Sequence, residues 1–345
     1  MFGIYRTLLA TAVLVDHFWS APGAGGVAVF SFFCLSGFLM TLLMTGPYRG
    51  RPFAFYLNRV LRLYPMYLAT GALTLLVASA IPLQTLITIP NGAASFARQL
   101  FYVVRIEDPG IVPTGWAVTN ELVFYLLIGL GVSRNLKFTA IWLACSAILV
   151  TIISARYGMW LLSLYFPWWS PALPFAFGAL LAHLARRFPA PKPMVAAAAL
   201  IGSAALTFGL MALAVAFKAR GGRETGLMLC LYASLIPTAV AILVLYRIGS
   251  PAWRTVDDWV GRLSYPMYLM QFVAAECVLA GWFVSFGPLG QFTSVLLVTV
   301  ALAAIAVMLI DVPIEKIRRR VRDGSAPAAP LAWPASREAV GMKDA

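Results

Sequence analysis

Two ionisable side chains interrupt the first apolar segment of the chain and constrain its fold more than any other feature. Arg6 and His17 lie within residues 4–19, a run that also carries Asp16 and is otherwise hydrophobic enough to be embedded in a membrane. An ionisable group at the centre of a spanning helix costs about 2.5–3.5 kcal/mol, so it is rare there without a partner or a function. Their separation is close to three helical turns, which places both side chains on one helix face, about 16 Å apart along the axis.

The composition also favours a membrane protein. The chain has 345 residues, 61% of them hydrophobic, and its mean hydropathy is +0.85, more than a soluble core absorbs. The 26 Lys and Arg outnumber the 13 Asp and Glu, an excess that cytoplasmic loops explain, so we expect no nucleic acid partner. There are two histidines, and the four cysteines lie in apolar runs without CxxC spacing. We therefore predict no metal site and no disulfide, and we expect the cysteines to be small core residues.

Ten apolar windows are long enough to cross a bilayer. They predict an all-α, polytopic bundle of about ten transmembrane helices, at residues 4–19, 26–44, 64–81, 115–132, 138–155, 171–185, 194–216, 227–246, 264–286 and 292–310. The first window resembles a signal peptide, but it contains acidic and imidazole groups and a second apolar segment follows at once. We therefore expect that it is not cleaved.

The positive charges predict the orientation of the bundle. With a cytoplasmic N-terminus, nineteen Lys and Arg fall on the cytoplasmic side and six on the opposite side. This bias predicts an N-in, C-in topology. Residues 1–315 form the predicted transmembrane domain, and residues 316–345 form a basic cytoplasmic tail whose Ala- and Pro-rich part is expected to be disordered.

His17 is the first candidate for chemistry. An imidazole can act as a general base near neutral pH, or it can accept an acyl group transiently. The alternative is a structural histidine that is hydrogen-bonded to a neighbouring helix. Asp16 does not share the helix face of His17, so we do not expect it to orient the ring.

A basic pair follows the second window. Arg59 and Arg62 are three residues apart, so a short helix would place both guanidiniums on one face. Guanidiniums grip phosphate oxygens in a bidentate manner, which suits a phosphorylated ligand. Plain anchoring by positive charge on the cytoplasmic side is the alternative. Pro65 is expected in the first turn of the next helix, where its missing N–H costs little.

Acidic and amide side chains add polarity to later windows. Glu121 lies about two turns into the fourth window and should not face lipid. It is suited to pair with an arginine, to orient an imidazole or to bind a sugar hydroxyl, and a structural ion pair is the alternative. In the ninth window Gln271 is the expected pocket residue, whereas Glu276 is expected near the outer surface. Asp311 and Glu315 are expected to form a local charge cluster with the basic residues that follow them.

These segments together resemble the membrane acyltransferase-3 family, whose members modify bacterial cell-surface or exported carbohydrates with acetyl or other acyl groups. The R-x10-H pattern of the family matches Arg6 and His17, and its R-x-x-R-x-x-P pattern matches Arg59, Arg62 and Pro65. Its glycine-rich entry and FF-x-LSGF segment match residues 25–27 and 32–38. Its patterns WSL-x-x-E-x-x-FY and G-x-x-SY-x-x-YL-x-H match Trp116, Glu121, Phe124, Tyr125, Gly261, Ser264, Tyr265, Tyr268 and Leu269.

The chain departs from these patterns at two places. Ala117 and Val118 replace the usual Ser-Leu, and Gln271 stands where the family often has histidine. The resemblance implies ten spans in the bacterial plasma membrane, and it implies acyl-CoA as a co-substrate and not as a permanently bound cofactor. It also implies functional roles for Arg6, His17 and the Arg59–Arg62 pair.

The sequence thus predicts an integral membrane O-acyltransferase. We expect it to move an acyl group, in the first place acetyl, from acyl-CoA to a hydroxyl of a cell-surface or exported carbohydrate or glycolipid, within membrane lipids. Arg59, Arg62 and Arg6 are the predicted acyl-CoA-binding residues, and the predicted catalytic residues are His17, Arg6 and Glu121. The predicted acceptor pocket consists of Trp116, Ser264, Tyr265, Tyr268 and Gln271.

Arg6 and His17 are expected to face one internal cavity that acyl-CoA enters from the cytoplasm. Two other classes of function would use a similar sequence. Buried ionisable groups also suit a proton-coupled exporter of a small or lipid-linked solute. A non-catalytic scaffold for cell-envelope assembly would need neither of the two residues.

Overall fold

Helices, most of them apolar, build most of the chain that the structure describes. The computed structural model describes residues 2–19, 21–101, 110–220, 224–248, 251–280 and 287–323, and within these ranges it contains helices and no strand. The predicted all-α class is therefore confirmed for these residues. The end of the predicted ninth window and the tail from residue 324 lie outside the described residues.

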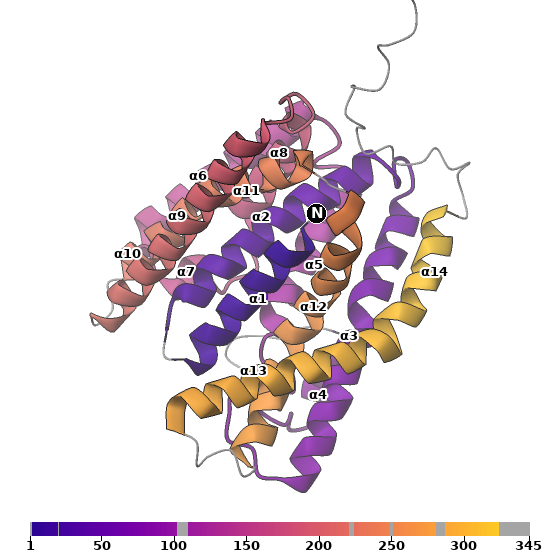
Figure 1. Cartoon of the computed structure of the whole chain (residues 1–345), viewed down its shortest axis with the longest axis vertical. Helices are drawn as coiled ribbons and strands as arrows, with labels where there is room; N and C mark the ends of the chain where they lie inside the picture. The colour runs from indigo at the N-terminus through magenta and orange to yellow at the C-terminus, as the bar shows by residue number, and fades with distance from the viewer. Residues whose placement is uncertain are drawn as a thin grey trace, which may run out of the picture.

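The helices follow one another through short connections, and each predicted window coincides with helix where it is described (Figure 1). In chain order they are α1 (Gly3–Phe18), α2 (Ala24–Thr45), α3 (Pro52–Ala80), α4 (Ala93–Leu100), α5 (Gly115–Gly129), α6 (Leu136–Tyr157), α7 (Leu161–Leu164), α8 (Ala172–Leu184), α9 (Pro193–Ala219), α10 (Glu224–Ala233), α11 (Leu235–Arg247), α12 (Pro251–Leu279), α13 (Gly287–Ala306), the π-helix η2 (Val307–Asp311) and α14 (Val312–Asp323).

Six stretches of helix in the described ranges are long and apolar enough to cross a membrane. They are α2, α3, α6, α9, α10 together with α11, and α13 through α14. Two further apolar helices, α5 and α8, are shorter. These helices make a multi-pass membrane protein, and the predicted count of about ten spans and the N-in orientation stay predictions.

Two prolines lie inside helices, so two predicted helix starts have to be corrected. Pro65 lies in the interior of α3 and not in the first turn of a new helix, so Arg59 and Arg62 belong to the same continuous helix as the third window. Pro266 likewise lies inside α12. An interior proline removes one backbone hydrogen bond, but in membrane proteins neighbouring groups compensate. Close to Pro65, the hydroxyl of Tyr265 donates a hydrogen bond of 3.0 Å to the carbonyl of Leu63 and joins α12 to α3. The carbonyl that Pro65 leaves without its helical partner is that of Leu61.

Small residues bring α2 and α8 into backbone contact. A Cβ at Gly37 would lie 2.1 Å from the carbonyl oxygen of Phe175, and a Cβ at Gly178 would lie 1.9 Å from that of Cys34. Lipid tails are as apolar as the side chains, so helices in a membrane associate largely through such close packing. α1, α3 and α5, which carry residues of the site described below, pack on α2 of this pair.

Only two of the four cysteines are buried in the protein core, where we expected all four. All four are free; Cys34 and Cys230 are buried, whereas Cys145 and Cys277 are exposed. The expectation of four core residues was wrong for the latter two. A helix in lipid exposes apolar side chains, so a small apolar residue has little preference for the interior.

α1 and α12 lie side by side and run in the same direction (Figure 1). At one end the carboxylate of Asp257 accepts hydrogen bonds from the backbone N–H groups of Gly3 (2.9 Å) and Ile4 (3.0 Å), which have no partner within α1. Towards the other end, Nδ1 of His17 lies 3.0 Å from Oε1 of Gln271. Contacts at both ends join residues 254 positions apart, so the two helices keep one register.

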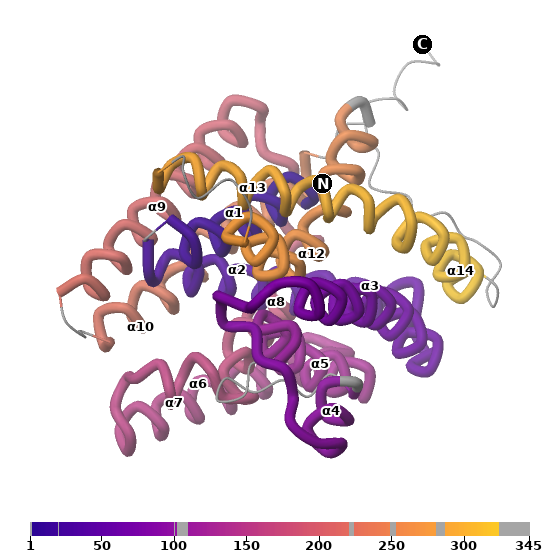
Figure 2. Tube along the Cα trace, turned by 90° about the horizontal axis from the view of Figure 1, so that it is seen from below, coloured from indigo at the N-terminus to yellow at the C-terminus, as the bar shows by residue number. Residues whose placement is uncertain are grey.

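The last described helix packs on α3, and Figure 2 shows α13 and α14 as one run across the molecule. Arg51 donates hydrogen bonds of 3.1 Å to the carbonyls of Val321 and Arg322, which lie in the last turn of α14 and lack helical partners. Asn58 donates to the carbonyl of Arg318 (3.1 Å). The predicted tail therefore begins as an ordered helix.

Candidate active site

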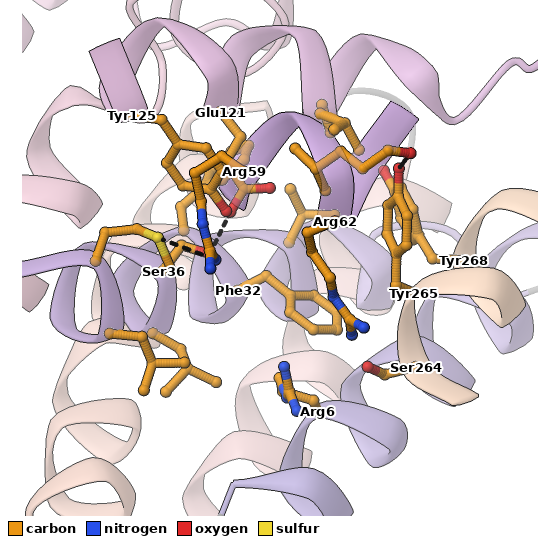
Figure 3. Close-up of a pocket in the computed structure, with 18 residues that line it drawn as sticks. Arg6, Phe32, Ser36, Arg59, Arg62, Glu121, Tyr125, Ser264, Tyr265 and Tyr268 are labelled. Atoms are coloured by element: carbon orange, nitrogen blue, oxygen red, sulfur yellow. Dashed lines mark hydrogen bonds between the residues drawn. The ribbon is translucent and has the colours of Figure 1, made fainter. Parts of the chain in front are cut away.

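A cavity of about 140 Å³ opens between α1, α2, α3, α5 and α12. The guanidiniums of Arg6, Arg59 and Arg62 gather around the ring of Phe32 on its wall (Figure 3). The residues that line it are Arg6, Val29, Phe32, Phe33, Leu35, Ser36, Leu39, Met40, Arg59, Arg62, Leu63, Ala117, Val118, Glu121, Tyr125, Ser264, Tyr265 and Tyr268. The fold thus brings together predicted site residues from four separate segments of the sequence.

Two of the three guanidiniums have unmet hydrogen-bonding capacity. The side chain of Arg59 is 9% exposed and donates to Oδ1 of Asn58 (2.7 Å) and to Sδ of Met40 (3.5 Å), while its Nε is buried without a partner. Nε of Arg6 is also buried without a partner. Within the described part of the chain, neither guanidinium forms an ion pair with a carboxylate. The cavity therefore offers uncompensated cationic donors to an anionic ligand or to an oxygen that becomes negative.

Glu121 is held by hydroxyl groups. Its carboxylate accepts a hydrogen bond from Ser36 on α2 and another from Tyr125, one turn further along α5 (2.5 Å). Neither an arginine nor the imidazole bonds to it among the described residues. Ser36 was not singled out as a site residue, although it lies within the matched FF-x-LSGF segment.

Arg62 shares an acidic partner with a second arginine. The carboxylate of Asp311, at the end of η2, pairs with Arg62 on α3 and with Arg262 on α12 (2.9 Å). Asp311 thus joins distant helices, and the prediction that it belongs to a local cluster was wrong. The reason is that α3 and α12 both contact η2, which places Arg62 and Arg262 beside this carboxylate. Glu315 does form the local pairs, with Arg318 (2.6 Å) and Arg319 (3.3 Å).

His17 does not line the cavity. It is exposed near the C-terminal end of α1, and its ring packs against Phe18 and Phe272, with centroid distances of 6.1 and 5.0 Å. The expectation that Arg6 and His17 face one cavity is wrong for the described residues, because on α12 the lining ends at Tyr268, one turn before the level of His17. Both residues nevertheless contact α12, as their spacing predicts.

Of the five residues of the predicted acceptor pocket, three line the cavity and two do not. Ser264, Tyr265 and Tyr268 line the cavity, and their role towards the acceptor stays a prediction. Trp116 does not, and instead packs on Tyr165 and Phe166 with centroid distances of 5.1 Å. Gln271 is fully buried and contacts His17, not the cavity.

At the end of the bundle where His17 lies, two carboxylates accept hydrogen bonds from other segments of the chain. The carboxylate of Asp16 accepts hydrogen bonds from the backbone N–H groups of Gly23 and Gly25, at the start of α2. Glu276, expected near the surface, is fully buried and accepts from the backbone N–H (2.8 Å) and the hydroxyl (2.6 Å) of Thr85. The sequence gives no sign that the segment after α3 folds back to meet this carboxylate.

The comparisons with known proteins identify one family. A family model described as an acyltransferase domain matches residues 4–309, which include Arg6, His17, Glu121, Gln271 and all residues that line the cavity. No curated protein and no solved structure matches the chain. The matched region covers most of the 345 residues. The chain therefore belongs to the acyltransferase-3 family and is a membrane acyltransferase, a transferase that acts on groups other than amino-acyl groups.

Proposed function

We propose that this acyltransferase moves an acyl group, in the first place acetyl, from acyl-CoA to a hydroxyl of a cell-surface or exported carbohydrate in the bacterial plasma membrane. The observation that carries the proposal is the cavity in which Arg6 and Arg59 lack a carboxylate partner among the described residues. The phosphates of coenzyme A, or the oxyanion that forms when a thioester carbonyl is attacked, would satisfy these donors.

The charge at the Arg6 end of the bundle supports entry of the donor there. Arg62 and Arg262 share the single carboxylate of Asp311, so this group of three keeps a net positive charge that attracts phosphate. A cavity of about 140 Å³ is smaller than the sites that enclose whole drug-sized ligands, which are about 300–1,000 Å³. We infer that the nucleotide stays at the entrance, on the cytoplasmic side in the predicted topology, while the thin pantetheine arm carries the acyl group inward.

His17 is the proposed base. Its imidazole removes the proton of the acceptor hydroxyl as the oxygen attacks the thioester carbonyl; the C–O bond forms, the C–S bond breaks, and the leaving thiolate takes the proton from the imidazolium. The products are an ester and free coenzyme A, and they are the same if His17 takes the acyl group first. Because His17 lies about 16 Å beyond Arg6 along α1 and does not line the cavity, the thioester has to travel beyond the level of Tyr268 to reach it.

The remaining residues have supporting roles. Glu121, held by Ser36 and Tyr125 on the cavity wall, is proposed to position the acceptor or a cationic partner. Ser264 and Tyr265 shape the wall on α12.

Membranes from a host without other transferases of this kind provide the test. They would be incubated with acetyl-CoA radiolabelled in the acetyl group, with and without the protein, and the extracted glycan would be examined for covalent label. Label that depends on the protein and is lost in His17→Ala supports the proposal. Flux of a solute without transfer of label would indicate a transporter, and full function of variants at both Arg6 and His17 would indicate a scaffold.

A further inference from the structure

Gln271 is a fully buried amide whose side chain contacts an exposed imidazole. Its Nε2 donates a hydrogen bond of 2.9 Å to the carbonyl of Tyr268, one turn earlier in α12. Its Oε1 lies 3.0 Å from Nδ1 of His17 on α1. Both ends of the amide are therefore satisfied, as a buried polar group requires.

The orientation of this amide determines which nitrogen of His17 carries the proton. With Nε2 of Gln271 used by the Tyr268 carbonyl, the atom that faces the ring is an oxygen, which can only accept. Nδ1 of His17 must then be the protonated nitrogen, and in the neutral ring Nε2 keeps its lone pair. No described residue bonds to Nε2 of His17, and the side chain is exposed, so this lone pair is open to a substrate.

We propose that Gln271 is a positioning residue that holds His17 in the Nδ1–H tautomer and so makes Nε2 the nitrogen that receives the proton of the acceptor hydroxyl. The inference rests on the proposed role of His17 as base. Without the amide oxygen, both tautomers would be populated, and the wrong one presents an N–H group to the acceptor. The amide oxygen also stabilises the imidazolium that forms during transfer, because it accepts a hydrogen bond from the charged ring.

The carboxylates nearest to the imidazole of His17 in the sequence of α1 and α12 are hydrogen-bonded to other groups. On α1 the carboxylate of Asp16 bonds to the start of α2, and on α12 that of Glu276 bonds to Thr85. The other charged residues of α12 precede Gln271 by nine positions or more, and neither α2 nor α13 contains a charged residue. A carboxylate introduced at position 271 would therefore be the first acid in direct contact with the imidazole.

Three variants test the inference, each assayed for transfer of labelled acetyl to glycan in membranes between pH 5 and 9. Gln271→Leu removes the acceptor, and we expect kcat to fall about ten- to a hundredfold with an unchanged KM for acetyl-CoA, since orientation of a general base is part of its contribution. Gln271→Glu keeps an acceptor of similar shape and should remain active. Its pH–rate profile should shift to higher pH on the acid side, because a carboxylate favours the protonated imidazole. Asn120→Leu, which removes another buried amide, bonded to the carbonyls of Phe166 and Pro167, is the control and should keep the wild-type profile.

The activities of these variants distinguish failure of the role of Gln271 from failure of the role of His17. A wild-type rate and profile in Gln271→Leu would overturn the inference while leaving the proposed function intact, provided that His17→Ala is inactive. Full activity of His17→Ala would instead remove the base itself. If Gln271→Leu does not accumulate in membranes, the Glu variant decides, and an unmoved acid limb there overturns the inference.

Discussion

The ionisable groups at the two ends of α1 differ in burial and in their hydrogen-bond partners. Arg6 lies in a cavity beside Arg59, whose side chain is 9% exposed, and neither has an ion-pair partner in the described chain. His17 is exposed and has a neutral amide as its neighbour. A buried cation without a partner is costly unless a ligand completes it, whereas an exposed imidazole is accessible to a substrate. We therefore propose that the first region binds the donor and that the second contacts the acceptor.

The difference between the two ends of α1 also separates donor binding from proton transfer, which the sequence predicted to share one cavity. In the proposed function, the donor binds in the cavity and the proton is transferred at the opposite end of the same helix. Substitutions in the two regions should therefore affect different kinetic constants.

The largest effect is expected at the histidine. His17→Ala should lower transfer of labelled acetyl by about a hundred- to ten-thousandfold, the usual contribution of a general base, and leave binding of acetyl-CoA unchanged. The matched control is His183→Ala, because Nε2 of His183 bonds to the carbonyl of Ser133, away from the residues that line the cavity. Equal losses in the two variants would argue for a structural role of both.

A smaller effect is expected in the cavity. Arg59→Ala should raise KM for acetyl-CoA about ten- to a hundredfold, the range expected when a hydrogen bond to a charged group is lost, with kcat much less affected. Initial rates over a range of acetyl-CoA concentrations measure the two constants. Arg49→Ala, at an exposed position, serves as the control. If kcat falls and KM does not change, Arg59 acts on the transition state and the separation of the two regions fails.

The smallest effect is expected at the entrance. Asp311→Asn removes the carboxylate that competes with phosphate for Arg62 and Arg262, so KM for acetyl-CoA should fall about threefold, in keeping with the modest energies of partly exposed ion pairs. The measurement is repeated at high salt, where the gain should shrink. Glu315→Gln, which removes the partner of Arg318 and Arg319, is the comparison variant. A rise in KM would instead mean that Asp311 holds Arg62 in its binding position.

The sequence predicted the helical fold and much of the cavity, but few of its contacts. Residue spacing determines which side chains share a helix face, so the shared face of Arg6 and His17 and that of Arg59 and Arg62 followed from it. Spacing says nothing about which helices meet. The bonds between Ser36 and Glu121 and between Arg62 and Asp311 cross 85 and 249 residues.

The same limit explains Gln271. Its position in the ninth window marked it as important, and its polarity suggested a pocket residue. The structure places it against His17, because α1 and α12 are parallel and keep one register. A single sequence does not reveal the direction in which two distant helices run past each other.

The parallel pairing of α1 and α12 constrains how the protein is made. The ribosome must deliver more than 250 further residues before the polar groups of α1 meet the helix that receives them. Until then the nascent first helix carries three ionisable groups, Arg6, Asp16 and His17, and such a group at the centre of a spanning helix costs about 2.5–3.5 kcal/mol. A chain that stops short of Pro251 therefore lacks the helix against which α1 packs.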